Sequence, residues 1–222
     1  MKLTKKLAEL VGIIIGDGHI CRHKNSYRIG FTGNPKTDKS YFKLIKNLIW
    51  IVWRKQSKIV KRGRGLRITF GSKKVFEELV YDLGLPYGEG KCERVKIPET
   101  IAKEWKFVKW TIREIVDTDG SVFAVNKPGA KNYPSIEITT SSYSLATQLK
   151  QNLTQRKFRV AKIWQYKSKL SRRTTYKVPL NGRKNLAKWI KEIGFSNPNK
   201  LKKAISIIKK VRRVGFEPTV PR

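Results

Sequence analysis

Two apolar segments that end in Asp-Gly constrain the fold of this chain of 222 residues more than any other feature. One ends at Asp17-Gly18 and the other at Asp119-Gly120, so the two aspartates stand 102 residues apart. Both segments carry apolar residues at helical spacing, and Asp and Gly both favour turns. One such segment is usually plain structure, whereas two copies at the spacing of a domain indicate a duplicated fold.

The residues after each Asp-Gly predict the same order of elements twice. In the first half we expect a helix at 5–16, strands at 19–23 and 26–32, a helix at 38–53 capped by Asp38, strands at 58–61 and 66–70, and a helix at 73–83. In the second half we expect a helix at 102–118, strands at 122–125 and 136–140, a helix at 144–156, strands at 160–166 and 174–180, and helices at 184–193 and 200–211.

A repeat of about a hundred residues fits two similar domains related by a pseudo-two-fold axis. The fold class is therefore α+β. We place an N-terminal half-domain at residues 1–97, a C-terminal half-domain at 98–213, and a loose tail at 214–222, with Pro98 at the boundary.

Basic residues dominate the composition. There are 50 Lys and Arg against 16 Asp and Glu, a net charge of +34, and both halves of the chain are basic. Such a charge favours a polyanion as partner, and nucleic acid is the usual one. Two cysteines and two histidines are too few for a disulfide framework or a zinc site. With no apolar run of membrane length and no signal segment, we expect no membrane partner and a location in the cytoplasm or nucleoid.

The two Asp-Gly segments resemble the LAGLIDADG motif, and the predicted element order resembles the αββαββα half-domain of LAGLIDADG homing endonucleases. The resemblance extends over residues 5–211 and is to the single-chain, double-motif type found among archaeal and organellar intron-encoded members. It implies a monomer in which two antiparallel sheets form a DNA-binding saddle. It also implies a site-specific endonuclease for intron homing, which hydrolyses phosphodiesters in double-stranded DNA at two pseudo-symmetric acidic sites.

The resemblance assigns catalysis and metal binding to Asp17 and Asp119, with the backbone carbonyls of Gly16 and Thr118 as further metal ligands. Oxygen ligands suit Mg²⁺, and Mn²⁺ or Ca²⁺ can substitute for binding. Gly12 and Gly16 share one helix face and allow close packing. In the second motif Glu114 stands at the position of Gly12, so the helix packing cannot be symmetric.

Three further residues of the motifs and their surroundings take roles from the family pattern. Lys91 and Lys200 follow the last helix of each half at similar spacing, and in similar proteins such a lysine helps to stabilise charge on the phosphate. Asp117 is a second acid in its motif, and its counterpart in the family is mostly structural. We therefore prefer Asp119 as the ligand.

Strand alternation and basic hairpins predict the residues that contact DNA. The two halves differ at these positions, which predicts a long asymmetric site. His19, beside the turn at Asp17, is a further candidate. The six tryptophans mostly fit core or helix-edge positions, so we interpret them as packing residues and not as base-stacking platforms. The DNA-binding candidates are Arg28, Thr32, Lys61, Arg62, Arg64, Arg67, Thr69, Glu137, Thr139, Lys167, Lys169, Arg172, Arg173 and Lys177.

The main alternative is an RNA maturase that binds intron RNA and assists the splicing of its own intron. Charge and fold would be the same, but RNA binding has no need of the paired acids Asp17 and Asp119. A transcriptional regulator on this fold would need an added DNA-binding domain, for which no residues remain. A nuclease embedded in an intein is not expected, because the chain starts with Met1 and lacks a terminal His-Asn pair.

Overall fold

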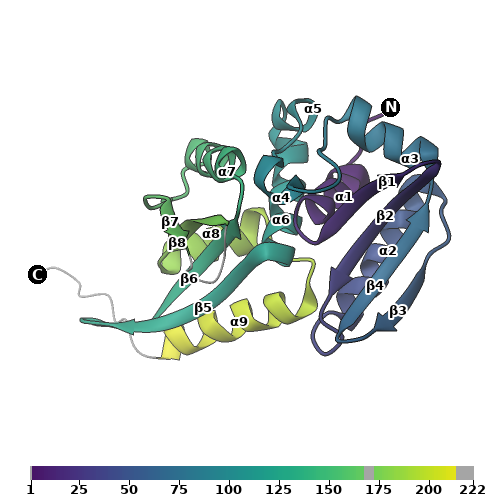
Figure 1. The fold of residues 1–222 in the computed structure, drawn as a ribbon. Coiled ribbons are helices and arrows are strands. Elements are labelled where there is room, and N and C mark those ends of the chain that lie inside the picture. Colours follow the sequence, from purple (N-terminus) through teal and green to yellow (C-terminus); the bar gives the residue numbers. More distant parts are fainter. Residues whose placement is uncertain (1, 168–172, 214–222) are drawn as a thin grey trace, which may run out of the picture.

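The fold consists of two four-stranded antiparallel sheets with two long helices, α1 and α6, between them (Figure 1). The structure, a computed structural model, describes residues 2–167 and 173–213. The tail predicted at 214–222, and the candidates Lys169 and Arg172, therefore lie outside the described residues.

The first half builds the sheet in the order β1-β2-β4-β3. All neighbouring strands are antiparallel. Successive side chains of a strand point to opposite faces of the sheet, so one face turns to the core and the other is polar. The elements are α1 (Lys5–Ile15), β1 (Gly18–His23), β2 (Ser26–Gly33), α2 (Lys39–Trp53), β3 (Lys58–Arg62), β4 (Gly65–Gly71), α3 (Lys73–Glu77) and the π-helical turn η1 (Glu78–Asp82).

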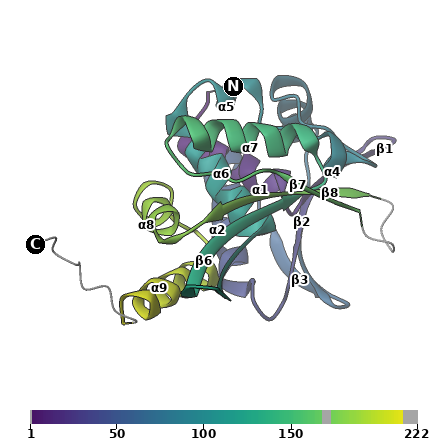
Figure 2. The ribbon, with the colours of Figure 1, turned by 90° about the vertical axis from the view of Figure 1, so that its left-hand side faces the viewer.

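The second half repeats this topology in the order β5-β6-β8-β7, and Figure 2 shows α7 and α9 lying apart on either side of its strands. Short helices α4 (Lys91–Arg94) and α5 (Glu99–Ala102) connect the halves. The elements that follow are α6 (Trp105–Asp119), β5 (Gly120–Lys127), β6 (Ala130–Thr140), α7 (Tyr143–Gln155), β7 (Trp164–Lys167), β8 (Thr174–Asn181), α8 (Arg183–Glu192) and α9 (Pro198–Arg213). The half-domain boundary between residues 97 and 98 remains a prediction.

Helices α1 and α6 pack side by side in the same direction, and small residues allow their close approach. A Cβ atom added to Gly12 would overlap the carbonyl oxygen of Thr111 and lie 2.8 Å from Cβ of Glu114. The hydroxyl of Thr111 donates to the carbonyl of Ala8 at 2.9 Å, which joins the two backbones directly. The predicted close approach at Gly12 is thus confirmed.

A buried polar network accounts for the departure of the second motif from small residues. Glu114, only 1% exposed, accepts hydrogen bonds from the Tyr41 hydroxyl at 2.6 Å and the Ser196 hydroxyl at 2.6 Å. Arg113 donates to Glu114 at 2.9 Å and to Glu9 of α1 at 2.7 Å. Three segments and both halves therefore meet at one carboxylate, and the predicted asymmetry of the packing has a physical basis.

The structure corrects the predicted elements at several points. The strand expected at 160–166 is shorter, because pairing with β8 begins at Trp164 after an isolated bridge at Val160. The helix expected at 73–83 continues as the π-helical η1 after Glu77, and the helix expected from 102 is divided into α5 and α6. Asp38 precedes α2, but its carboxylate accepts from the Asn34 amide at 2.7 Å rather than from the helix.

Within the described residues, we find no helix that is both long enough and apolar enough to cross a membrane.

Gly12→Ala should destabilise the fold, because its methyl group would enter the α1–α6 contact against backbone atoms. We expect a loss of about 1–3 kcal/mol in the free energy of unfolding. For a chain of this size each kcal/mol lowers the melting temperature by about 2–4 °C, which calorimetry can measure. Gly65→Ala is the matched control, since its Cβ would find no atom nearer than 3.7 Å. Equal melting temperatures for the two variants would contradict the close packing.

Candidate active site

The touching ends of α1 and α6 bring Asp17 and Asp119 together. Helix α1 ends at Ile15 with Gly16 as its cap, and α6 ends at Asp119 itself. A Cβ atom on Gly16 would overlap the side chain of Thr118 and lie 3.3 Å from Oδ2 of Asp119. The two predicted acids, 102 residues apart in sequence, therefore share one site.

Both acids have raised pKa values, mainly because they are buried. Burial, together with the neighbouring charges of Asp119 and Asp38, raises the pKa of Asp17 to about 7, although Lys200 and Lys91 oppose this. Burial likewise raises the pKa of Asp119 to about 6, although Lys91 and Lys200 oppose this. Two carboxylates at helix C-termini are electrostatically unfavourable without a cation.

Each helix end is held by one lysine from the same half. The Lys91 ammonium donates to the carbonyls of Ile14, Ile15 and Gly18 at the end of α1, at 2.5 Å in the case of Gly18. The Lys200 ammonium donates to the carbonyls of Val116, Thr118 and Gly120 at the end of α6, at 2.7, 3.1 and 2.6 Å. Since an ammonium has three donors, both lysines are fully used as helix caps.

This arrangement differs from the role expected of the two lysines. Lys91 is 9% exposed, and burial lowers its pKa to about 8. Burial also lowers the pKa of Lys200. The lysines offset the negative ends of both helices, and their predicted contact with a phosphate stays a prediction.

Asp117 has a structural role, as the family pattern implied. One of its oxygens accepts from the backbone amides of Ser196, at 2.5 Å, and Asn197, at 3.0 Å. These bonds fasten α6 to the segment that leads into α9 and Lys200. Asp117 therefore holds α6 in place through the segment before α9, while Asp119 lies beside Asp17.

The donor set at this site fits a divalent metal of the magnesium type. No group of three or more His, Cys, Asp and Glu residues suited to a metal occurs in the described parts of the chain. Mg²⁺ is often bound through one or two carboxylates together with water and phosphate oxygens. Asp17 and Asp119 supply the two carboxylates. The carbonyl of Thr118 already accepts from Lys200, but a carbonyl oxygen has a second lone pair.

Strand register places four predicted DNA-binding residues on one face of the first sheet. Thr32 pairs with Arg67, Thr69 lies two residues along β4 from Arg67, and Arg28 lies four residues along β2 from Thr32. All four side chains therefore share one face, which we call the first polar face. His19, opposite Gly30, lies on this face too; burial lowers its pKa, as do Lys91, Arg67 and Arg28. In the adjoining hairpin Lys61, Arg62 and Arg64 are all exposed, although Lys61 pairs with Leu66 and so lies on the other face of the sheet from Arg67.

The matching face of the second sheet, the second polar face, carries Glu137, Thr139, Thr175 and Lys177. Lys177 and Glu137 form an ion pair at 2.8 Å, so each would exchange this partner for a base. Lys167 is exposed at the end of β7, on the opposite face.

Arg173, expected to clamp a phosphate, contacts the first half instead. Its guanidinium pairs with Glu93 of α4 at 3.0 Å and donates to the thiol of Cys92 at 3.3 Å. The hairpin of the second half is thereby joined to the connection between the halves. Sequence reasoning missed this contact because the two segments lie 80 residues apart.

The tryptophans differ in burial, and Trp53, Trp105 and Trp110 are partly buried. Trp189 is fully buried and donates to the carbonyl of Gly194 at 2.9 Å, as expected for packing. Trp50, 45% exposed on helix α2, fits the expected helix-edge position, whereas Trp164 is 68% exposed on a strand, so its interpretation as a packing residue is wrong.

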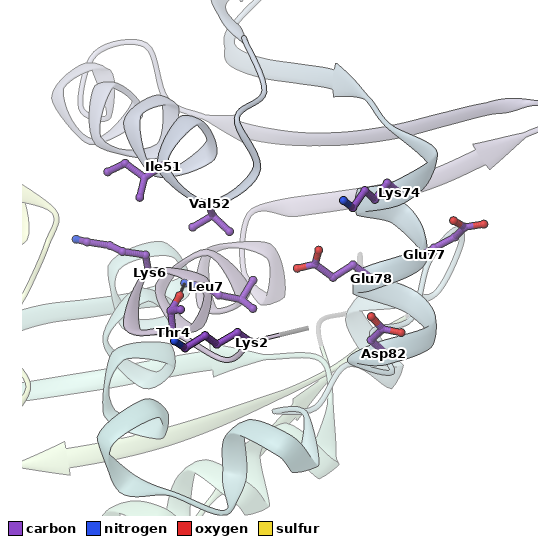
Figure 3. Close-up of a pocket in the computed structure, with 10 residues that line it drawn as sticks. All are labelled: Lys2, Thr4, Lys6, Leu7, Ile51, Val52, Lys74, Glu77, Glu78 and Asp82. Carbon is purple, nitrogen blue, oxygen red and sulfur yellow. Dashed lines mark hydrogen bonds between the residues drawn. The ribbon is translucent and has the colours of Figure 1, made fainter.

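A hollow of about 780 Å³ lies at the opposite end of α1 (Figure 3). Glu78 of η1 and Leu7 of α1 point toward one another across it. Eleven helical residues span about 16 Å, so the hollow is separate from the paired acids. It is lined by Lys2, Thr4, Lys6, Leu7, Ile51, Val52, Lys74, Glu77, Glu78 and Asp82.

Known proteins share both the sequence and the architecture. Residues 106–194 match a LAGLIDADG-like domain. The chain is 31% identical over 210 residues to a replication factor C small subunit of Methanocaldococcus jannaschii, and 30% identical over 208 residues to one of Thermococcus kodakarensis. These alignments cover 93% and 92% of the chain but only 10% and 21% of the relatives. The matched segment is thus a small part of each relative.

Solved structures show the same fold. Variants of the homing endonuclease I-DmoI superpose with a TM-score of 0.60 at 18% identity, covering 86% of this chain and 95% of theirs. The homing endonuclease I-WcaI, bound to its DNA recognition sequence, superposes with a TM-score of 0.58 at 15% identity, covering 90% and 88%.

The fold and the site together define an α+β protein of two repeated halves, with paired acids where two central helices end. Residues 106–194 thus form a LAGLIDADG-like domain. The described chain has the fold of the homing endonucleases I-DmoI and I-WcaI, with one central helix, α1 or α6, in each half.

Without metal, stability should fall as the pH rises. The carboxyls of Asp17 and Asp119 have folded pKa values of about 7 and 6, above the ordinary value of 3.8. The folded state therefore binds more protons between about pH 4 and 7, and it loses this advantage as pH increases through that range. In EDTA, we expect a melting temperature several degrees lower at pH 8 than at pH 5.

Asp17→Asn should reduce this pH dependence. It should not abolish it, because burial also raises the pKa of Asp117 to about 7. An unchanged slope in the variant would show that the acid pair is not the cause.

Lys200→Met should destabilise the end of α6, because the carbonyls of Val116, Thr118 and Gly120 lose their donor. We expect a loss of about 1–3 kcal/mol in the free energy of unfolding, measured by urea denaturation without DNA. Lys202→Met, an exposed lysine on the same helix, is the control. A normal stability for Lys200→Met would argue against the cap.

Proposed function

We propose that this protein is a site-specific double-strand DNA endonuclease that uses divalent metal, with a role in intron homing. The observation that carries the proposal is the meeting of Asp17 and Asp119 at the touching ends of α1 and α6. A pair of buried carboxylates is costly in a structural role, but it is well suited to hold cations that in turn bind phosphate oxygens.

The structural neighbours support the same chemistry. Forms of I-DmoI have been crystallised in complex with DNA and Mn, with DNA and Ca, and with target DNA in the presence of Mg. We extend divalent metal use from these proteins to this chain, with Mg²⁺ as the main cofactor. Asp17 and Asp119 would hold the metal, with the Gly16 and Thr118 carbonyls beside them. Bound metal would activate water and stabilise the leaving oxygen.

The protein's own residues then have three tasks. Lys91 and Lys200 hold both helix ends, so the two acids stay at a fixed separation. The hydroxyl–carbonyl bond from Thr111 to Ala8 and the network at Glu114 hold the two halves together. The two polar faces bind the DNA, with phosphates met by exposed lysines and arginines of the hairpins.

The target is expected to be long and non-palindromic. At equivalent positions of the two halves, the first polar face carries Arg67 and Thr69, and the second carries Lys177 and Pro179. The second face also has an ion pair between Glu137 and Lys177, which has no counterpart among the first-face residues named above. Since each half reads different bases, a single chain can bind an asymmetric site as a monomer. The maturase alternative stays a prediction of the sequence.

Asp17→Asn and Asp119→Asn should each lower the rate of DNA cleavage by roughly two orders of magnitude or more. The native protein, given host genomic DNA and Mg²⁺, should cut at one long asymmetric sequence and leave short overhangs, which sequencing of the cut ends identifies. Binding of the variants to that same site in Ca²⁺ serves as control for folding. Tight binding with no metal-dependent cleavage by the native protein would overturn the nuclease.

A further inference from the structure

Two aromatic rings stand exposed side by side on the second polar face. Trp164 is 68% exposed and Tyr166 is 58% exposed. Trp164 pairs with Lys177 and Tyr166 pairs with Thr175, so both rings lie on the polar face rather than against the core. Among the described residues, neither ring packs against another aromatic ring. Tyr176, on the core side of β8, differs in this respect, because its ring centroid lies 5.3 Å from that of Tyr143.

Strand β7 is the outermost strand of its sheet, and all four of its residues are exposed. Single exposed aromatics are common on protein surfaces, but two neighbours on one face form a small apolar patch. Two residues along a strand span about 6.6 Å, so each ring can accept one base of an extended strand. Lys162, which is exposed, precedes Trp164 by two residues and adds positive charge at that end of the pair.

The first half has a different chemistry at the matching positions. Across from Arg67, the counterpart of Lys177, stands Val60, and two residues further along β3 stands Arg62. The first sheet thus presents a small apolar side chain and a cation where the second presents two rings. The difference concerns exposed positions, so packing of the core does not explain it.

From these observations we propose that Trp164 and Tyr166 form a stacking platform for the unpaired bases of single-stranded RNA. In duplex DNA the faces of the bases are stacked inside the helix, and only base edges and thymine methyls are open to a side chain. Unpaired loops and ends of RNA offer base faces, and aromatic residues on a sheet bind them by stacking. The surrounding positive charge suits the phosphates.

This platform needs neither metal nor the acid pair, so it does not rest on the proposed nuclease. Binding of an unstructured, labelled oligouridine is measured by fluorescence anisotropy in EDTA, at 0.15 and 0.5 M KCl. We expect Trp164→Ala and Tyr166→Ala each to weaken binding by about 5- to 100-fold. The loss should persist at high salt, because salt weakens phosphate contacts more than stacking.

A transplant of the first-half residues separates stacking from charge. The double variant Trp164→Val with Tyr166→Arg gains a positive charge, yet it should bind RNA more weakly than the native protein. The single variant Trp164→Phe, which keeps an aromatic ring, should retain most of the RNA affinity that Trp164→Ala loses. Trp50→Ala, an exposed aromatic of α2, should bind RNA within about 2-fold of native, a spread expected from measurement alone.

Three results would overturn the proposal. The transplant could bind RNA as well as the native protein, which would assign binding to charge alone. Single-stranded DNA of the same sequence could bind equally well and suffer the same losses, which would remove RNA as the partner. Duplex DNA could lose affinity in the variants while RNA does not, which would make the rings readers of the duplex. As a control, the melting temperatures of all variants should equal that of the native protein, because the substituted residues are exposed.

Discussion

The close contact of α1 with α6 is the constraint on which the rest of the structure depends. It needs small residues at Gly12 and Gly16, and it forces the helix ends, with Asp17 and Asp119, into one place. Like charges at helix C-termini repel each other and oppose the helix dipoles. The repulsion between the two carboxylates destabilises the fold at the helix ends, and contacts elsewhere in the structure offset it.

The stabilising contacts that offset this repulsion are unevenly distributed between the two halves. Both helix ends receive a lysine cap, from Lys91 and from Lys200. Only α6 also carries the buried network of Arg113 and Glu114, which reaches Glu9, and the bonds of Asp117 to the segment before α9. The two halves are therefore symmetric in topology and in their caps, while their fastening is concentrated on the second motif.

The helices, the strands and the polar faces could be predicted from the sequence, because hydrophobic periodicity and turn residues determine structure locally. The apolar spacing before Asp17 and Asp119 predicts both helices, and alternation predicts the polar faces that carry Arg28 and Arg67. Contacts across long separations could not be predicted. Arg173 with Glu93 and Lys200 with three carbonyls depend on how distant segments pack. The exposure of Trp164 could not be predicted either, because its strand carries apolar and polar residues on both faces.

The fastening of α6 also has a consequence for the order of synthesis. Ser196, Asn197 and Lys200, which hold the acids and carbonyls at the end of α6, all follow that helix by about 80 residues. While a ribosome is still making the second sheet, α6 can pack against α1 but lacks these ties. The bonds to Asp117 and the lysine cap of α6 can form only after residue 200 has emerged, so the end of α6 is fastened last.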